Sequence, residues 1–151
     1  MTTIYPKLTD LQALVGKEMA SSDWITIDQR RIDLFAEATG DHQWIHVDPA
    51  RAAAGPFKTT VAHGFLTLSL LPEMAASAYD VADRRMGVNY GLNKVRFPSP
   101  VPVGSRLRGH FKLVEYKAIE GGAQLTVEVV MEREGSDKPV CVAESVSRHF
   151  V

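Results

Sequence analysis

A carboxylate and an imidazole that could act together on one water molecule lie close together in the first third of the sequence. Asp41 and His46 are five residues apart and follow Gly40, a residue type that commonly ends a helix. If the chain turns here, the two side chains can hold a water, so that one removes its proton while the other orients it. Histidine titrates near neutral pH and can take and return that proton. The spacing alone is common, and Asp41 could equally cap the next turn.

A second pair, His63-Gly64, opens a long apolar stretch. Glycine has no side chain, so its N–H can come close to a ligand, and at a helix start the helix dipole reinforces that N–H. Such a donor could stabilise the negative charge that develops on a thioester oxygen. An acid/base pair and an oxyanion donor together are what the addition of water to an activated double bond requires. In the structural alternative, Gly64 only allows the helix to pack tightly.

The same residues have a rival interpretation as a metal site. His42 and His46 are four residues apart. Asp41, Asp48 and His63 could complete a ligand set. A histidine pair at this spacing needs a helix to bring both rings to one side, and the turn-like composition after the glycine argues against one. We therefore expect no metal.

Length and charge exclude several classes of function. The 151 residues predict one domain, residues 1–151, and an apolar content of 45% is enough for a hydrophobic core. The 17 basic and 18 acidic residues nearly cancel, which predicts neither a nucleic-acid nor a membrane partner. Cys141 is the single cysteine, in an alternating run typical of a buried residue rather than a nucleophile. Without a signal-peptide pattern or an apolar run of about 18 residues, we expect a cytoplasmic protein.

Helical and extended patterns are segregated along the chain. Helices are predicted at 7–20, from Asp28 to Gly40, and at 64–79, where Pro72 should bend or interrupt an apolar helix. Residues 24–27 indicate a short strand, and 41–62 read as an irregular segment. Long strands are predicted at 85–97, 104–118, 123–134 and 139–150. This order predicts an α+β fold in which an antiparallel sheet wraps around the apolar helix.

A further candidate segment runs over residues 89–102. Lys94 and Arg96 alternate with apolar residues, so on a strand both charges share one face and could contact the phosphates of a nucleotide-like group. Asn89 and Asn93 could bind a polar acyl or pantetheine group. An ordinary solvated strand face is the alternative for all four residues.

Taken together, these motifs resemble the MaoC-like, (R)-specific enoyl-CoA hydratases. Phe35, Gly40-Asp41, His46 and the later His63-Gly64 match the family pattern, and 40–46 and 89–97 look like its NodN-type branch and mycobacterial single-hot-dog hydratases. The resemblance covers the chain from about Leu8 onward. It implies a hot-dog fold and a homodimer.

The resemblance also implies a reaction. Water would add reversibly to a trans-2-enoyl-CoA to give a (3R)-3-hydroxyacyl-CoA, with CoA or an acyl-carrier protein as the carrier and no separate cofactor. Asp41 and His46 would activate the water, and the Gly64 N–H would bind the thioester oxygen. The substrate-binding residues expected are Gln43, His63, Asn89, Asn93, Lys94 and Arg96.

One departure from the family pattern concerns the residues before His46. Gln43-Trp44 replaces the usual Asn-Pro, which removes a rigid turn and places an indole where it could reshape the acyl tunnel. Gln43 can still donate and accept hydrogen bonds. Two other functions remain open, a hot-dog acyl-CoA thioesterase and a non-catalytic acyl-CoA-binding protein.

Overall fold

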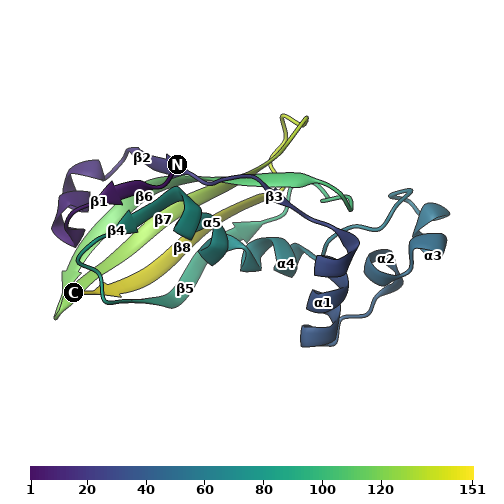
Figure 1. The fold of residues 1–151 in the computed structure, drawn as a ribbon, viewed down its shortest axis with the longest axis horizontal. Coiled ribbons are helices and arrows are strands. Elements are labelled where there is room, and N and C mark those ends of the chain that lie inside the picture. Colours follow the sequence, from purple (N-terminus) through teal and green to yellow (C-terminus); the bar gives the residue numbers. More distant parts are fainter.

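Strands from the second half of the chain form most of one curved antiparallel sheet. The computed structural model describes residues 1–151 (Figure 1). The long strands are β5 (Met86–Arg96), β6 (Arg106–Ile119), β7 (Gly122–Arg133) and β8 (Cys141–Phe150). With β2 (Glu18–Ser21) they are ordered β2-β6-β7-β8-β5, and the short β3 (Ile25–Thr26) pairs with β6. Alternate residues of β7, Leu125, Val127, Val129 and Met131, are buried. The period-two pattern therefore predicted these strands correctly, with small differences at their ends.

The apolar helix packs against this sheet in two pieces. The chain is helical over α4 (Gly64–Ser69) and α5 (Leu71–Ala78), and the break at Leu70 precedes Pro72 in the first turn of α5. Proline has no N–H to donate and is tolerated in a first helical turn, so the predicted interruption is confirmed. A stripe at four-residue spacing is buried: Leu66, Leu70, Met74 and Ala78. The sheet covers this side of the helix and leaves Phe65 exposed.

Glycine in the sheet allows α5 to lie close to β6. A Cβ atom on Gly109 would stand 3.0 Å from the sulfur of Met74. A larger residue here would press on the Met74 side chain and on the ring of Phe111.

The prediction of a helix over 7–20 was wrong. A 3-10 helix, η1 (Leu8–Leu14), is followed by Gly16 with φ 84° and then by β2. The buried Leu8 and Leu11 are three residues apart, which suits the three-residue turn of a 3-10 helix. Next to this region, β1 (Thr3–Tyr5) pairs in parallel with β4 (Tyr79–Val81).

Three helices extend beyond one end of the sheet (Figure 1). In α1 (Gln29–Thr39), Asp28 accepts a hydrogen bond from the Arg31 N–H, and Gly40 ends the helix with φ 80°, as predicted. The segment expected to be irregular contains α2 (Trp44–Val47) and α3 (Pro49–Ala53). Asp48 caps α3 by accepting from the Arg51 N–H, and Pro49 occupies the first turn of this helix.

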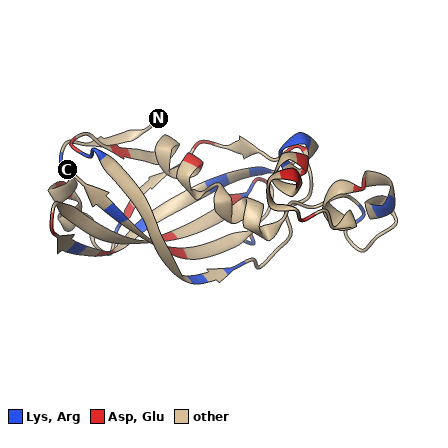
Figure 2. Ribbon diagram, turned by 90° about the horizontal axis from the view of Figure 1, so that it is seen from below, with Lys and Arg blue, Asp and Glu red and all other residues tan.

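Charged residues of both signs are interspersed over the ribbon (Figure 2). Arg106 on β6 pairs with Glu134, just beyond the end of β7, at 2.8 Å, and Arg108 on β6 pairs with Glu132 on β7 at 3.0 Å. None of the helices has both the length and the apolar character needed to cross a bilayer. Cys141 is fully buried, and burial raises the pKa of its thiol to about 11, as the prediction of a buried, unreactive cysteine requires.

Candidate active site

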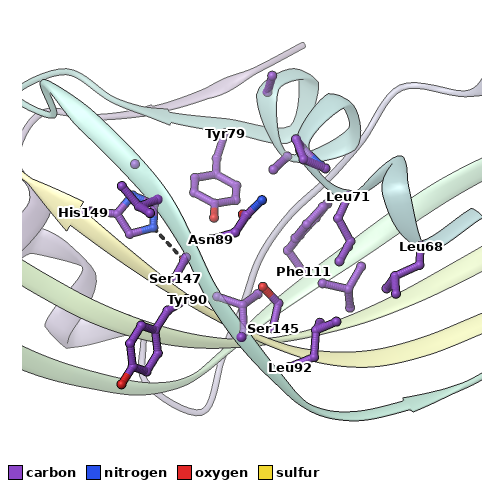
Figure 3. Close-up of a pocket in the computed structure, with 18 of the residues that line it drawn as sticks. Leu68, Leu71, Tyr79, Asn89, Tyr90, Leu92, Phe111, Ser145, Ser147 and His149 are labelled. Carbon is purple, nitrogen blue, oxygen red and sulfur yellow. Dashed lines mark hydrogen bonds between the residues drawn. The ribbon is translucent and has the colours of Figure 1, made fainter. Parts of the chain in front are cut away.

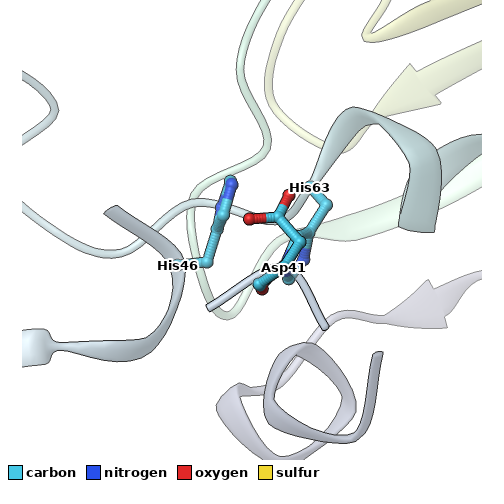
Figure 4. Close-up of side chains that lie close together, drawn as sticks. All are labelled: Asp41, His46 and His63. Carbon is cyan, nitrogen blue, oxygen red and sulfur yellow. The ribbon is translucent and has the colours of Figure 1, made fainter. Parts of the chain in front are cut away.

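Asp41, His46 and His63 meet where α1, α2 and α4 converge (Figure 4). Asp41 follows the glycine that ends α1, His46 lies on α2, and His63 immediately precedes α4. One side-chain nitrogen or oxygen from each lies within 4.8 Å of the others. Both imidazoles are buried, whereas the carboxylate is exposed. The site therefore has a solvent-facing acid above two desolvated rings.

The ring of His46 is held in one orientation by the backbone. Its Nδ1 lies 2.6 Å from the carbonyl oxygen of Val61. A carbonyl only accepts, so Nδ1 carries the proton and Nε2 has a free lone pair. Gln29 fixes the neighbouring backbone, because its amide donates to the His46 carbonyl at 2.8 Å while its oxygen accepts from Thr60 at 2.5 Å.

The surroundings of His46 favour the neutral imidazole. Burial is the largest effect and lowers its pKa. The hydrogen bond to Val61 and the Asp41 charge act in the opposite direction, while His63 lowers the pKa further. The pKa lies below its usual value, so His46 can accept a proton at neutral pH.

His63 presents a second lone pair to the same space. Its Nε2 lies 3.0 Å from the Asp41 backbone carbonyl and must therefore donate to it. Its Nδ1 is buried and has no hydrogen-bond partner in the chain. The ring stacks on His46 with centroids 3.9 Å apart, and Phe35 packs 4.9 Å away.

Three groups that can accept a hydrogen bond thus lie close together. They are the Asp41 carboxylate, the ring of His46, whose Nε2 has no partner in the chain, and the ring of His63, whose Nδ1 has none. A water molecule can donate to two of them, and a divalent cation is the other species that such lone pairs accommodate. The Gln43 N–H donates to the Asp41 carboxylate at 3.3 Å and helps to orient it. The arrangement is suited to activating water.

Gly64 begins α4, next to His63. The first N–H groups of a helix have no acceptor within it and can donate to a ligand. A Cβ on Gly64 would lie 3.1 Å from the ring of Phe97, so a larger residue would press on that ring. The close approach gives a packing reason for glycine as well as a functional one.

The residues predicted on β5 divide between two faces of the sheet. Asn89 lines a cavity described below. Lys94 and Arg96 pair in register with Glu144 and Val142, so they lie on the opposite face from the odd-numbered residues of β8 that line the cavity. Asn93 donates to Glu144 at 2.7 Å. The structure does not bring Asn93, Lys94 and Arg96 together with the Asp41–His46–His63 cluster.

A cavity of about 600 Å³ runs between α4–α5 and the sheet (Figure 3). It begins at Leu68 and Ser69, one helical turn beyond Gly64, and its floor includes Phe111 and Val127. Most of its lining is apolar, as expected for an acyl chain.

The other end of the cavity is polar, and the sequence analysis identified only Asn89 among its residues. It is formed by Tyr79, Asn89, Ser147 and His149. The alternation of Ser145, Ser147 and His149 on a predicted strand could have shown that these residues share a face. The role of the Val61 carbonyl was also missed, and no side-chain pattern could have shown it.

Trp44 does not reshape this cavity. Its ring packs against Gly55, where a Cβ would stand 2.9 Å from the indole, and the Arg51 guanidinium lies 4.5 Å from the ring centroid. The expectation of a narrowed acyl tunnel is not borne out for this cavity, since the indole lies instead within the α2–α3 segment.

Fold and sequence together define the class of protein. Residues 10–135 match the family described as "MaoC like domain", and the chain belongs to this family. The resemblance in the sequence motifs is thereby confirmed.

Individual relatives are similar over nearly the full length. The "3-hydroxyacyl-thioester dehydratase Z" of Mycobacterium tuberculosis (strain ATCC 25618 / H37Rv) is 56% identical over 146 residues, which cover 96% of this chain and 97% of the relative. "Nodulation protein N" of Rhizobium leguminosarum bv. viciae is 49% identical, covering 93% of this chain and 89% of the relative. The expected likeness to the NodN-type and mycobacterial branch is confirmed.

Among solved structures, "R-Hydratase PhaJ1 from Pseudomonas aeruginosa in the unliganded form" has a TM-score of 0.71 at 26% identity. The similarity covers 90% of this chain and 81% of that one. The hot-dog architecture predicted from the motifs is confirmed.

Proposed function

We propose that the protein is an (R)-specific enoyl-CoA hydratase, which adds water reversibly to a trans-2-enoyl thioester to give the (3R)-3-hydroxyacyl thioester. The observation that carries the proposal is the position of the His46 ring. The Val61 carbonyl holds its Nδ1, which leaves the lone pair of Nε2 without a partner in the chain, and the ring lies close to the Asp41 carboxylate. A protein that only binds acyl thioesters would not require a neutral imidazole beside a carboxylate.

The broader prediction of a hydro-lyase is confirmed at the level of the enzyme class. The chain shares the MaoC-like family and 56% identity with a relative named as a 3-hydroxyacyl-thioester dehydratase. The finer points, namely the residues, the stereochemistry and the thioester carrier, belong to our proposal.

In the proposed reaction, the enoyl thioester lies with its carbonyl oxygen toward the N–H of Gly64. His46 accepts a proton from the water as the oxygen forms a bond to C3, and Asp41 orients the water and stabilises the imidazolium. The charge moves to the thioester oxygen, and C2 then receives the proton from the same side. One water is consumed and every atom is accounted for, so no separate cofactor is required.

The experiment measures the loss of the conjugated thioester of crotonyl-CoA, with product chirality determined by an (R)-specific dehydrogenase. Asp41→Asn and His46→Ala should lower turnover by about 10²- to 10⁴-fold, the usual contribution of general acid/base groups. The matched controls Asp137→Asn and His42→Gln change exposed residues outside the cluster and should retain activity. Near-normal activity of Asp41→Asn would remove this carboxylate from the mechanism.

The thioesterase alternative is tested in the same samples. Release of free thiol from crotonyl-CoA or from a saturated acyl-CoA, without formation of the 3R alcohol, would replace our proposal with thioester hydrolysis. Binding of crotonyl-CoA with neither product would indicate an acyl-CoA-binding protein.

A homodimer forms part of the proposal. β5 is the outer strand of the sheet, and one of its edges is unpaired along all 11 residues. Val88, Tyr90 and Leu92 on this strand are exposed. A second copy pairing along β5 would cover these residues and close the side of the cavity that they line. We also propose that the protein is located in the cytoplasm.

A further inference from the structure

The polar end of the cavity contains hydrogen-bonding groups that the fold does not use. The Tyr79 hydroxyl and the Asn89 amide line the cavity and make no side-chain hydrogen bond within the chain. Figure 3 shows them, with Ser147, among the residues that line the cavity. Tyr79 itself is only 7% exposed. A buried hydroxyl such as that of Tyr79 normally has a partner, either in the protein or in a ligand or water, whereas the exposed Asn89 amide is free to bind a ligand from the solvent side.

Ser147 adds a hydroxyl whose proton is free. Arg84 can only donate, and its Nη1 lies 3.5 Å from Nδ1 of His149, so this nitrogen acts as the acceptor. The ring proton is therefore on Nε2, which lies 2.8 Å from the Ser147 oxygen and donates to it. The hydroxyl proton of Ser147 remains available to the cavity.

This pair is not a second catalytic centre. A general base acquires positive charge, and the neighbouring Arg84 cation opposes that charge on His149. The arginine supports instead a neutral imidazole that holds Ser147 in place. The chemistry available at this end of the cavity is hydrogen bonding.

The charges nearby indicate which ligand group fits. Arg84 is already paired with Asp80 at 2.9 Å. A carboxylate brought to this end would meet a cation that is already neutralised and would lose its hydration, which is costly. A neutral oxygen, such as a hydroxyl, can receive the proton of Ser147 and bond to Tyr79 and Asn89.

The position of the cavity relative to Gly64 sets the direction in which a ligand would enter. The lining begins at Leu68 and Ser69, one helical turn or about 6 Å beyond Gly64. An acyl chain whose thioester lies at Gly64 would enter the cavity there, with its tail directed to the polar end that Tyr79, Asn89 and Ser147 line.

We propose that this cavity selects acyl thioesters whose tails carry a neutral hydroxyl near the far end, recognised by Ser147, Tyr79 and Asn89. This inference rests on the proposed hydratase function for the placement of the thioester at Gly64. It assigns to the enzyme a substrate class, acyl chains that carry a hydroxyl in the tail.

The test compares trans-2-enoyl-CoA esters of about six to about fourteen carbons with their ω-hydroxy and ω-carboxy derivatives of the same length. Dissociation constants are measured by calorimetry on the Asp41→Asn protein, so that binding is observed whether or not the wild type turns the substrate over. Two or three hydrogen bonds are expected to favour the ω-hydroxy chain by at least about fivefold. Ser147→Ala combined with Tyr79→Phe should abolish this preference, while Ser136→Ala, in the turn between β7 and β8, should leave it intact.

Each outcome decides the matter. Equal affinity for the plain and ω-hydroxy chains, or tighter binding of the ω-carboxy chain, overturns the assignment of a neutral oxygen site. If the preference is present but survives the double substitution, these side chains are not its cause and the inference is also wrong. Failure of the wild type to hydrate crotonyl-CoA is a separate result, which contradicts the hydratase function alone. Circular dichroism of the double variant shows whether it is folded.

Discussion

Replacing His149 by glutamine should make the folded protein much less sensitive to acid. His149 is only 6% exposed, and its burial, followed by the charge of Arg84, lowers its pKa from 6.5 to about 4. Glutamine keeps a donor and an acceptor near Ser147 and has no proton to gain between these values. The substitution therefore isolates the cost of protonating a buried imidazole.

The sign follows from proton binding in the two states. Between pH 6.5 and about 4 the unfolded chain binds a proton on this residue and the folded chain does not, so stability falls as the pH falls through this range. At neutral pH both states are neutral, and the full stability is present. The pKa difference of about 2.5 corresponds to roughly 3.4 kcal/mol in total, of which about 2 kcal/mol is lost by about pH 5.

The assay is urea unfolding at about pH 7 and about pH 5, at one fixed protein concentration because a dimer's stability depends on concentration. The wild type should lose about 2 kcal/mol more than His149→Gln between the two pH values. His42→Gln is the matched control, because His42 is exposed and its replacement should leave the wild-type difference unchanged. Equal pH sensitivity in the wild type and His149→Gln would refute the assignment of a neutral, buried His149.

Two further predictions concern the active site. Because burial lowers the pKa of His46 and the proposed mechanism needs its neutral form, the decline of kcat/KM for crotonyl-CoA at acidic pH should be centred below pH 6.5; a decline centred above 6.5 in the pH–rate profile would contradict this role. Because the three facing lone pairs are assigned to water, prolonged dialysis against EDTA should leave turnover unchanged, as measured with crotonyl-CoA before and after dialysis. A loss of activity that zinc or another divalent cation restores would assign the cluster to a metal.

The regular strands and α1 could be predicted from the sequence because local chemistry determines them. Asp28 and Gly40 mark the ends of α1 through a side-chain cap and a left-handed residue. The alternation in β7 reflects burial of one face. The segment 7–20 failed because Leu8 and Leu11 suit both an α-helix and a 3-10 turn, and pairing of β2 with β6 decides the outcome. That pairing joins residues about ninety positions apart, which no local pattern records.

The candidate site shows the same division. Asp41, His46, His63 and Gly64 were identified because their residue types are informative. Their orientation was not, since it depends on the Val61 carbonyl and on Gln29, which lie in other parts of the chain. The polar end of the cavity combines β4, β5 and β8, and only the folded sheet brings these strands together.

The replacement of Asn-Pro by Gln43-Trp44 shows how the site keeps its geometry without a rigid turn. Trp44 packs on Gly55 and beneath Arg51, so that the indole joins the start of α2 to the end of α3. The His46 ring is then oriented by the Val61 carbonyl, and Val61 is itself held to α2 by a hydrogen bond from its N–H to the carbonyl of Ile45 at 3.0 Å. The two bonds run in opposite directions between the same segments, so moving His46 would cost both. Packing and reciprocal hydrogen bonds thus provide the rigidity that a proline would otherwise contribute, and the lone pair on Nε2 stays directed toward Asp41.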